Sequence, residues 1–141
     1  MTPPQRRGGR GYRPPASDPA RLAAYDVLVA VRERDAYANL VLPGLLRERR
    51  LDTRDAAFAT ELAYGTLRGK GLYDEVLQAC VDRPLAQVDP PVLDLLRLGA
   101  HQLLRMRVPS HAAVSATVDL ARRVVSAARL IWPRAIISRQ A

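Results

Sequence analysis

Few residues of this 141-residue chain are of types that perform covalent or metal chemistry. The sequence holds one cysteine, Cys80, and two histidines, His101 and His111. One thiol cannot form an intramolecular disulfide, and these three side chains are too few to complete a zinc site. Cys80 falls on the apolar face of a predicted helix with no adjacent Pro or His. The pattern therefore favours a small buried core residue over a nucleophile.

Patterns for acid–base catalysis and for phosphate loops are equally sparse. Asp74 and Glu75 are adjacent, and helical neighbours point about 100° apart, so they predict a solvated face and not a facing carboxylate pair. His101 and His111 share no triad or metal spacing and are interpreted as structural, although His111 at a helix start could touch a phosphate. The glycines form no GxGxxG turn after a strand. The sequence thus predicts no catalytic residue and no metal site.

Arginines at the two ends of the chain remain as candidates for binding. The net charge is +8, yet the first 13 residues hold four arginines and no acid, residues 120–141 hold five arginines and no acid, and the part between has a net charge of −1. This distribution fits a nearly neutral body with basic ends that meet phosphates, because neutralising phosphates releases counterions. A solubilising tail is the alternative. The charge distribution alone leaves both interpretations open.

Residues 1–17 have the composition of a disordered arm. They contain four prolines, three glycines and almost nothing apolar, so burial cannot offset the entropy lost on ordering. Four arginines surround Tyr12, and such an Arg/Gly segment can follow a phosphate backbone and stack a base. An inert tail is the equally weighted alternative.

From Asp18 onward the apolar periodicity is helical. Asp18 is predicted to cap a first helix that runs to about Arg32 with Pro19 at its first position. Residues 37–50 predict a second helix, with Pro43 expected in its first turn. Thr53 is predicted to cap either one long helix or two that join near Gly69 and Gly71. Phe58, Leu62, Gly65, Leu67, Leu72, Val76 and Cys80 recur along it at steps of three and four residues.

Two further helices complete the pattern. One starts after Asp89, is apolar on most sides as far as Leu103 and Leu104, and should be central and buried. The last is predicted to be capped by Ser110, with Ala113, Val114, Thr117, Val118, Ala121 and Val125 facing inward. No segment alternates convincingly as a strand, so we predict an all-α fold of five to seven helices in a compact bundle.

Residue usage changes in the last segment, 127–141. Isoleucine and tryptophan first occur at Ile131 and Trp132. We expect a divergent tail, from a truncated or frame-shifted end, or else an ordinary apolar terminal helix interrupted by Pro133. No apolar run approaches a membrane span, and the Arg/Gly/Pro-rich start does not resemble a signal peptide. A cytoplasmic location and no membrane partner are therefore expected.

Four blocks of the sequence together resemble a known family. They are DPARLAAYDVLVAV, RDAAFATELAYGTLRGKGLYDEVL, RPLAQVDPPVLDLLRLGAHQLL and RVPSHAAVSATVDLARR. In this order and spacing they resemble the N-terminal NusB-like domain of the bacterial 16S ribosomal RNA cytosine-C5 methyltransferases of the RsmB (Sun or Fmu) family. The resemblance covers about residues 18–125. It implies an all-helical RNA-binding domain, as in the antitermination factor NusB, which we place at residues 18–126.

The resemblance ends before the parts that carry the family's chemistry. In the family a Val-Asn-Ala-Val-Leu-Arg-Arg type helix and a Rossmann-like domain that binds S-adenosylmethionine follow, whereas here the match stops near Arg123–Ser126. Methylating carbon 5 of cytosine needs an attacking thiolate, a second group to release the adduct and a donor-binding loop. We therefore expect no enzyme activity and no cofactor for this chain. S-adenosylmethionine is the cofactor of the full-length family, and a catalytic methyltransferase domain is a candidate partner.

RNA contact is the activity that the residues support. Arg21 lies in the first turn of the first predicted helix, directly after the arm, and by resemblance to NusB this segment meets RNA. The leading candidates are Arg6, Arg7, Arg10, Tyr12, Arg13 and Arg21. Weaker candidates are Arg68, Lys70, Arg105, Arg107 and His111; for the first four, a solvated face or the preference of cations for helix C-termini is the favoured interpretation.

The sequence thus predicts an RNA-binding NusB-like domain for ribosomal RNA. A free-standing NusB-type antitermination factor, which binds RNA with a ribosomal protein partner, is the first alternative. A helical DNA-binding regulator and a protein-interaction module are the others. Arg21 has two interpretations. As a phosphate contact, its replacement by Glu weakens RNA binding; as a solvated residue, the same change leaves affinity unaltered and slightly favours the helix.

Overall fold

The computed structural model describes residues 18–131, with side chains as far as Val125. In that part of the chain the secondary structure consists of helices and turns without a strand. The elements are α1 (Pro19–Arg34), α2 (Ala38–Glu48), α3 (Thr53–Arg68), α4 (Lys70–Cys80), the short 3-10 helix η1 (Leu85–Gln87), α5 (Pro90–Leu104) and α6 (Ser110–Ile131). The predicted all-α class is confirmed, and so is the helix number. The N-terminal arm, residues 1–17, and residues 132–141 of the tail lie outside the described residues.

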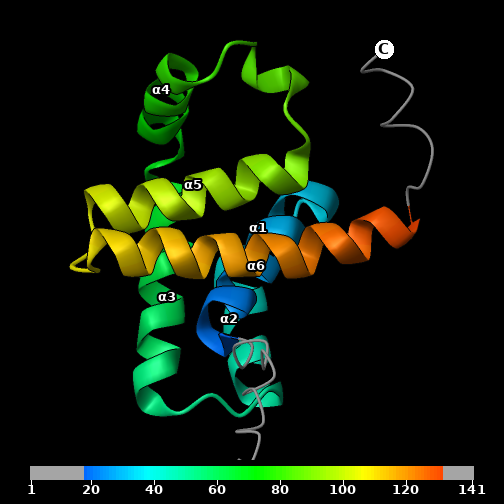
Figure 1. Ribbon diagram of the computed structural model, residues 1–141. Coiled ribbons are helices and arrows are strands. Elements are labelled where there is room, and N and C mark those ends of the chain that lie inside the picture. The colour runs from blue at the N-terminus through cyan, green and yellow to red at the C-terminus, as the bar shows by residue number, and fades with distance from the viewer. Residues whose placement is uncertain (1–17, 132–141) are drawn as a thin grey trace, which may run out of the picture.

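The helices form two groups that cross each other: α1, α2 and α3 in one, and α5 and α6 in the other (Figure 1). α5 and α6 lie side by side and run in opposite directions, while α3 passes behind them and α4 continues above. α1 packs against α2, α3 and α5. The α3–α4 junction lies behind α5, on the side of the molecule where α5 turns into α6 (Figure 1).

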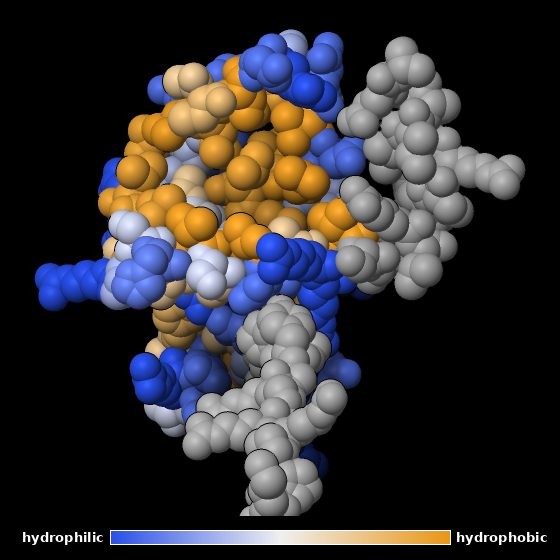
Figure 2. Space-filling view, viewed as in Figure 1, coloured by the Kyte–Doolittle hydropathy of each residue, from blue (hydrophilic) through white to orange (hydrophobic). Residues whose placement is uncertain are grey.

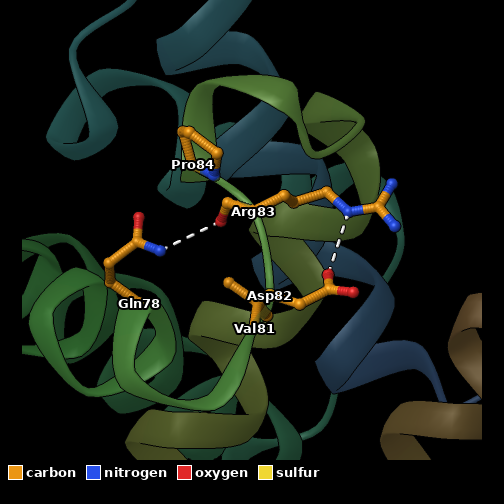
Figure 3. Close-up of a pocket in the computed structure, with 5 residues that line it drawn as sticks. All are labelled: Gln78, Val81, Asp82, Arg83 and Pro84. Atoms are coloured by element: carbon orange, nitrogen blue, oxygen red, sulfur yellow. Dashed lines mark hydrogen bonds and ion pairs between the residues drawn. The ribbon is translucent and has the colours of Figure 1, made fainter.

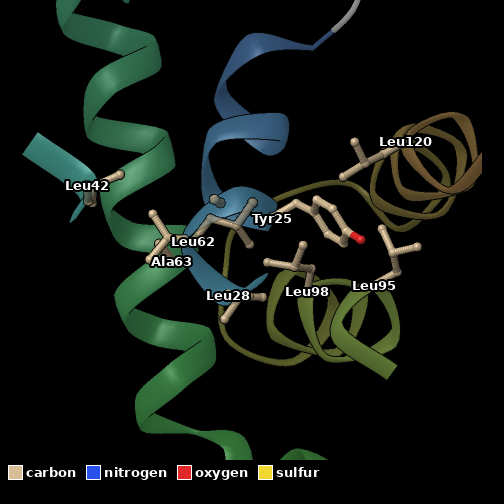
Figure 4. Close-up of a cluster of buried hydrophobic side chains, with 10 residues drawn as sticks. Tyr25, Leu28, Leu42, Leu62, Ala63, Leu95, Leu98 and Leu120 are labelled. Carbon is tan, nitrogen blue, oxygen red and sulfur yellow. The ribbon is translucent and has the colours of Figure 1, made fainter. Parts of the chain in front are cut away.

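The core lies where α1, α3, α5 and α6 meet (Figure 4). Val27 and Leu62 are fully buried, and Leu98 is almost so. The Tyr25 ring reaches from α1 toward Leu95 of α5 and Leu120 of α6. Apolar burial of this kind contributes about 25 cal/mol for each Å² removed from water, so these contacts hold the two helix groups together.

The helix starts follow from local capping. Asp18 caps α1 as predicted: its carboxylate accepts a hydrogen bond from the Arg21 N–H at 3.0 Å, and Pro19 occupies the first helical position. The predicted cap at Thr53 is wrong, because Asp52 accepts from the Asp55 N–H at 2.8 Å and Thr53 is already helical. The cap predicted at Ser110 is also wrong, because Ser110 is already helical. α6 begins at Ser110 itself, with the Ala113 N–H bonded to the Pro109 carbonyl.

Two expectations about helix interiors are also resolved. Pro43 was expected in a first turn but lies inside α2, because that helix already starts at Ala38 with Leu40 and Val41 bonded to the Tyr37 carbonyl. The missing Pro43 N–H leaves the carbonyl of exposed Asn39 to water. Residues 53–80 form two helices that join at Gly69, which is the second of the two alternatives.

The predicted inward face of residues 70–80 is wrong. Cys80 is exposed at the end of α4, and Leu72 and Val76 are exposed as well. The break at Gly69 turns α4 out of the register of α3, so Tyr73 and Leu77 supply its buried face. The exposed position of Cys80 removes the interpretation of this thiol as a core residue.

α5 and α6 also leave apolar side chains in water. α5 is central as predicted, but Leu103 and Leu104 are about half exposed. Val114 and Val118 were expected to face inward and are exposed, because α6 packs through Ala113 and Leu120 on a neighbouring face. Figure 2 shows the resulting apolar area, hollowed between α4 with η1 and the pair α5 and α6.

α6 continues past residue 126, where the divergent tail was expected to start, and ends at Ile131. The boundary between the domain and the tail stays a prediction.

Candidate nucleic-acid interface

Arg21, the leading candidate within the described residues, is held by three other side chains. Its Nε donates to Gln102 Oε1 on α5 at 2.8 Å, and its Nη1 forms an ion pair with Asp18. The guanidinium carbon lies 4.8 Å from the centroid of the Phe58 ring on α3. The side chain is only 13% exposed. Arg21 therefore connects α1 with α3 and α5, and the interpretation of Arg21 as a merely solvated residue is wrong.

Gln102 extends this network into α6. It is fully buried, and its Nε2 donates to the Leu98 carbonyl at 3.1 Å and to Thr117 Oγ1 at 3.2 Å. A buried amide is stabilising only when its donors and acceptor are all paired, and here they are. The start of α1 is thereby fixed to the last turns of α5.

A second buried network joins α4 to α5. The Tyr73 hydroxyl and His101 Nδ1 are 2.5 Å apart, and the rings meet edge to face with centroids 5.6 Å apart. Two glycines of the α3 end make room for these rings. A Cβ at Gly65 would lie 2.2 Å from His101 Nε2, and a Cβ at Gly69 would lie 2.5 Å from the Tyr73 ring. Only glycine fits at these positions while the rings keep their places.

The buried pair is kept uncharged by its surroundings. Burial lowers the pKa of His101, an effect that Arg68 and Arg105 add to and that Glu61 opposes. Glu61 Oε1 lies 3.3 Å from His101 Nε2, but the two atoms are not aligned as a hydrogen bond. Burial also raises the pKa of Tyr73. Both shifts favour the uncharged forms, in which the phenol O–H can donate to His101 Nδ1, and this agrees with the structural role predicted for His101.

Four of the weaker candidates gather around this pair. Arg68 ends α3 and Lys70 begins α4, while Arg105 follows α5 and Arg107 lies in the turn before α6. All four side chains are exposed, and among residues 18–125 none of them forms an ion pair. A Cβ at Gly69, between Arg68 and Lys70, would touch the Tyr73 ring, and Tyr73 is bonded to His101, four residues before Arg105. The two turns that carry the four residues therefore lie close together. We call Arg68, Lys70, Arg105 and Arg107 the basic quartet. His111 is also exposed, at the start of α6.

Two arginines of the body join helices through buried or half-buried acids. Arg97 binds Asp74 through two hydrogen bonds, of 2.7 and 3.0 Å, which joins α5 to α4. Asp74 is therefore not the solvated residue that the sequence predicted. Arg32 donates to Asp94 at 2.9 Å and joins α1 to α5. Burial raises the pKa of Asp94, against the opposing effect of Arg32. These pairs hold helices together and leave their charges unavailable to a ligand.

The connection between α4 and α5 encloses a shallow, open hollow (Figure 3). Its lining consists of Gln78, Val81, Asp82, Arg83 and Pro84. Gln78 donates to the Arg83 carbonyl at 2.9 Å and accepts from the Leu85 N–H at 3.1 Å. The polar side chain therefore fastens the connection itself.

Within residues 18–131 no group of three or more His, Cys, Asp or Glu residues has the arrangement of a metal site. In the same range no helix combines the length and apolar character of a membrane span. The arm candidates Arg6, Arg7, Arg10, Tyr12 and Arg13 lie outside the described residues. Sequence spacing gave no sign that the two turns carrying the basic quartet lie close together, because they are more than 30 residues apart in the chain.

Comparison with known proteins identifies the relatives of this chain. Residues 18–129 match the model of the NusB family. A Mycobacterium tuberculosis protein named as a methyltransferase is 60% identical over 112 residues, which cover 79% of this chain and 24% of that protein. The ribosomal RNA small subunit methyltransferase B of Pseudomonas putida is 36% identical over 104 residues, which cover 74% of this chain and 23% of that protein.

A third relative has a different name. The transcription antitermination protein NusB of Halorhodospira halophila is 44% identical over 70 residues, which cover 49% of this chain and 45% of that protein. The chain spans about a quarter of the length of the methyltransferase relatives and matches their N-terminal part. Because the family model covers most of the chain and the fold is all-helical, the chain belongs to the NusB family.

Proposed function

We propose that this chain binds RNA, and that its ligand is ribosomal RNA. The observation that carries the proposal is the match of residues 18–129 to the NusB family together with relatives named as ribosomal RNA methyltransferases. The excess of positive charge at the ends of the chain supports it, because phosphate contacts supply most of the sequence-independent affinity for nucleic acid.

The role proposed for the domain is to recruit ribosomal RNA, and not to catalyse its methylation. The chain corresponds to the N-terminal quarter of its methyltransferase relatives. The same proposal includes a catalytic methyltransferase domain as partner, with S-adenosylmethionine as the cofactor of that domain. It also includes a cytoplasmic location. Free-standing antitermination is the second candidate, which the similarity to the Halorhodospira NusB protein favours. The longer match to the methyltransferases favours the first.

The arm supplies the first test. Deleting residues 1–17 should leave the helical content unchanged, because Asp18 and its bond to the Arg21 N–H remain. RNA affinity should fall, and the slope of log affinity against log salt should become shallower by about 3, since four phosphate contacts are lost at about 0.7 to 0.9 each. Circular dichroism and RNA titrations at several salt concentrations measure both effects.

A full-length control separates charge from chain length. Replacing Arg6, Arg7, Arg10 and Arg13 by Gln keeps the arm and should reproduce the loss. An unchanged salt slope in both variants would exclude the arm as an RNA contact.

A further inference from the structure

We infer that the basic quartet is a binding site for the RNA phosphate backbone. This inference rests on the proposed function and names the surface of the folded body that carries it. Among the described residues, the quartet combines exposed side chains, no ion pair with an acid, and positions at two turns that meet at the contact between Tyr73 and His101.

The backbone of the two turns is held in place by buried contacts. The 2.5 Å contact between Tyr73 and His101 joins α4 to α5 close to both turns. Gly65 and Gly69 allow the α3 end to approach these rings. Because the backbone positions of the four cations are fixed by packing, binding a phosphate orders only their side chains.

Among the described side chains, none of the four cations of the quartet forms an ion pair with an acid. Glu61 is exposed and lies 3.3 Å from His101 Nε2. Placing cations at helix C-termini is in itself favourable, and Arg68 occupies such a position on α3. Lys70 directly follows the end of α3 and begins α4, so the two helix dipoles act on it in opposite directions. A phosphate bound between the two turns would attract all four cations.

Side-chain contacts connect the start of α1 with the end of α5 that precedes the quartet. Arg21, three residues after Asp18, is bonded to Gln102, and Gln102 lies three residues before Arg105. Phosphate contacts of the quartet would fix the position of RNA and read no bases.

The test removes the four charges from the full 141-residue chain. The variant replaces Arg68, Lys70, Arg105 and Arg107 by Gln. Its matched control replaces four other exposed arginines that form no ion pair among the described side chains: Arg34, Arg47, Arg54 and Arg123. Both variants lose the same net charge, so a general charge effect acts on both equally.

The probe is a single-stranded RNA of mixed sequence, titrated at several salt concentrations. The quartet variant should lose about tenfold or more in affinity, and its salt slope should become shallower by about 3, whereas the control should change much less. Equal losses in the two variants would overturn the site while leaving RNA binding in place. Failure of the unaltered chain to bind would overturn both proposals. If circular dichroism shows that the quartet variant is unfolded, the pairs Arg68/Lys70 and Arg105/Arg107 are replaced separately.

Discussion

Replacing Gly65 by Ala should destabilise the protein by about 3 kcal/mol and lower its melting temperature by about 10 °C. The added Cβ would lie 2.2 Å from His101 Nε2 and 2.3 Å from His101 Cε1, inside van der Waals contact. The imidazole cannot simply move, because its Nδ1 is bonded to the Tyr73 hydroxyl. Either α3 moves away from α5, or the buried hydrogen bond breaks. Thermal and denaturant unfolding measure the loss.

Gly71→Ala is the matched control. Gly71 is the second residue of α4, and a Cβ there would meet nothing within 4 Å. Alanine should therefore stabilise the helix by about 0.5 to 1 kcal/mol. His101→Ala in the Gly65→Ala background should cost less than the sum of the two single changes, since the clash is removed. Equal effects of Gly65→Ala and Gly71→Ala would contradict this account of the α3–α5 contact.

Replacing Arg21 by Glu should also destabilise the fold, by about 2 to 3 kcal/mol. The change removes the bond to Gln102, the ion pair with Asp18 and the contact with the Phe58 ring. The new Glu side chain also places a carboxylate beside the Asp18 carboxylate and the side-chain oxygen Oε1 of Gln102. A hydrogen bond with a charged partner contributes about 1.5 to 3 kcal/mol, whereas a carboxylate in the first turn gains only about 0.3 to 1 kcal/mol from the helix dipole. The lost contacts therefore dominate.

Arg54→Glu is the control for the effect of the helix dipole on the free energy of unfolding. Arg54 lies in the first turn of α3, is exposed, and forms no ion pair within residues 18–125. Its replacement by Glu should change the free energy of unfolding by less than about 1 kcal/mol. Chemical denaturation of both variants gives the comparison, and RNA titration of folded Arg21→Glu then shows whether Arg21 also contacts phosphate. An Arg21→Glu protein as stable as the Arg54→Glu protein would refute the connecting role of Arg21.

Local patterns predicted most of the fold. Asp18 followed by Pro19 predicted the start of α1, and the break at Gly69 was one of two stated possibilities. The predictions that failed concern which side chains are buried, where burial depends on neighbours distant in sequence. Periodicity places Val114 and Val118 on an apolar stripe, but it does not say which part of the stripe meets α5. For Cys80, the change of register at Gly69 decided the outcome.

The candidate site was harder to predict than the fold. Arg21 was identified from its place after the arm, but its bond to Gln102 spans 81 positions and has no signature in the sequence. Arg68 and Arg105 were identified as separate clusters at helix ends. Their convergence depends on the packing of Tyr73 against His101, a contact between residues 28 positions apart. Long-range packing, and not residue type, therefore assembles the basic quartet.

The central claim is that this NusB-family chain binds RNA through its cations, and equilibrium titration of the unaltered chain with a 16S ribosomal RNA fragment tests it most directly. At about 150 mM salt we predict saturable binding with a dissociation constant of about 1 μM or tighter, and log affinity that falls linearly with log salt. Absence of saturation up to about 100 μM, or an affinity that salt does not change, would contradict the claim.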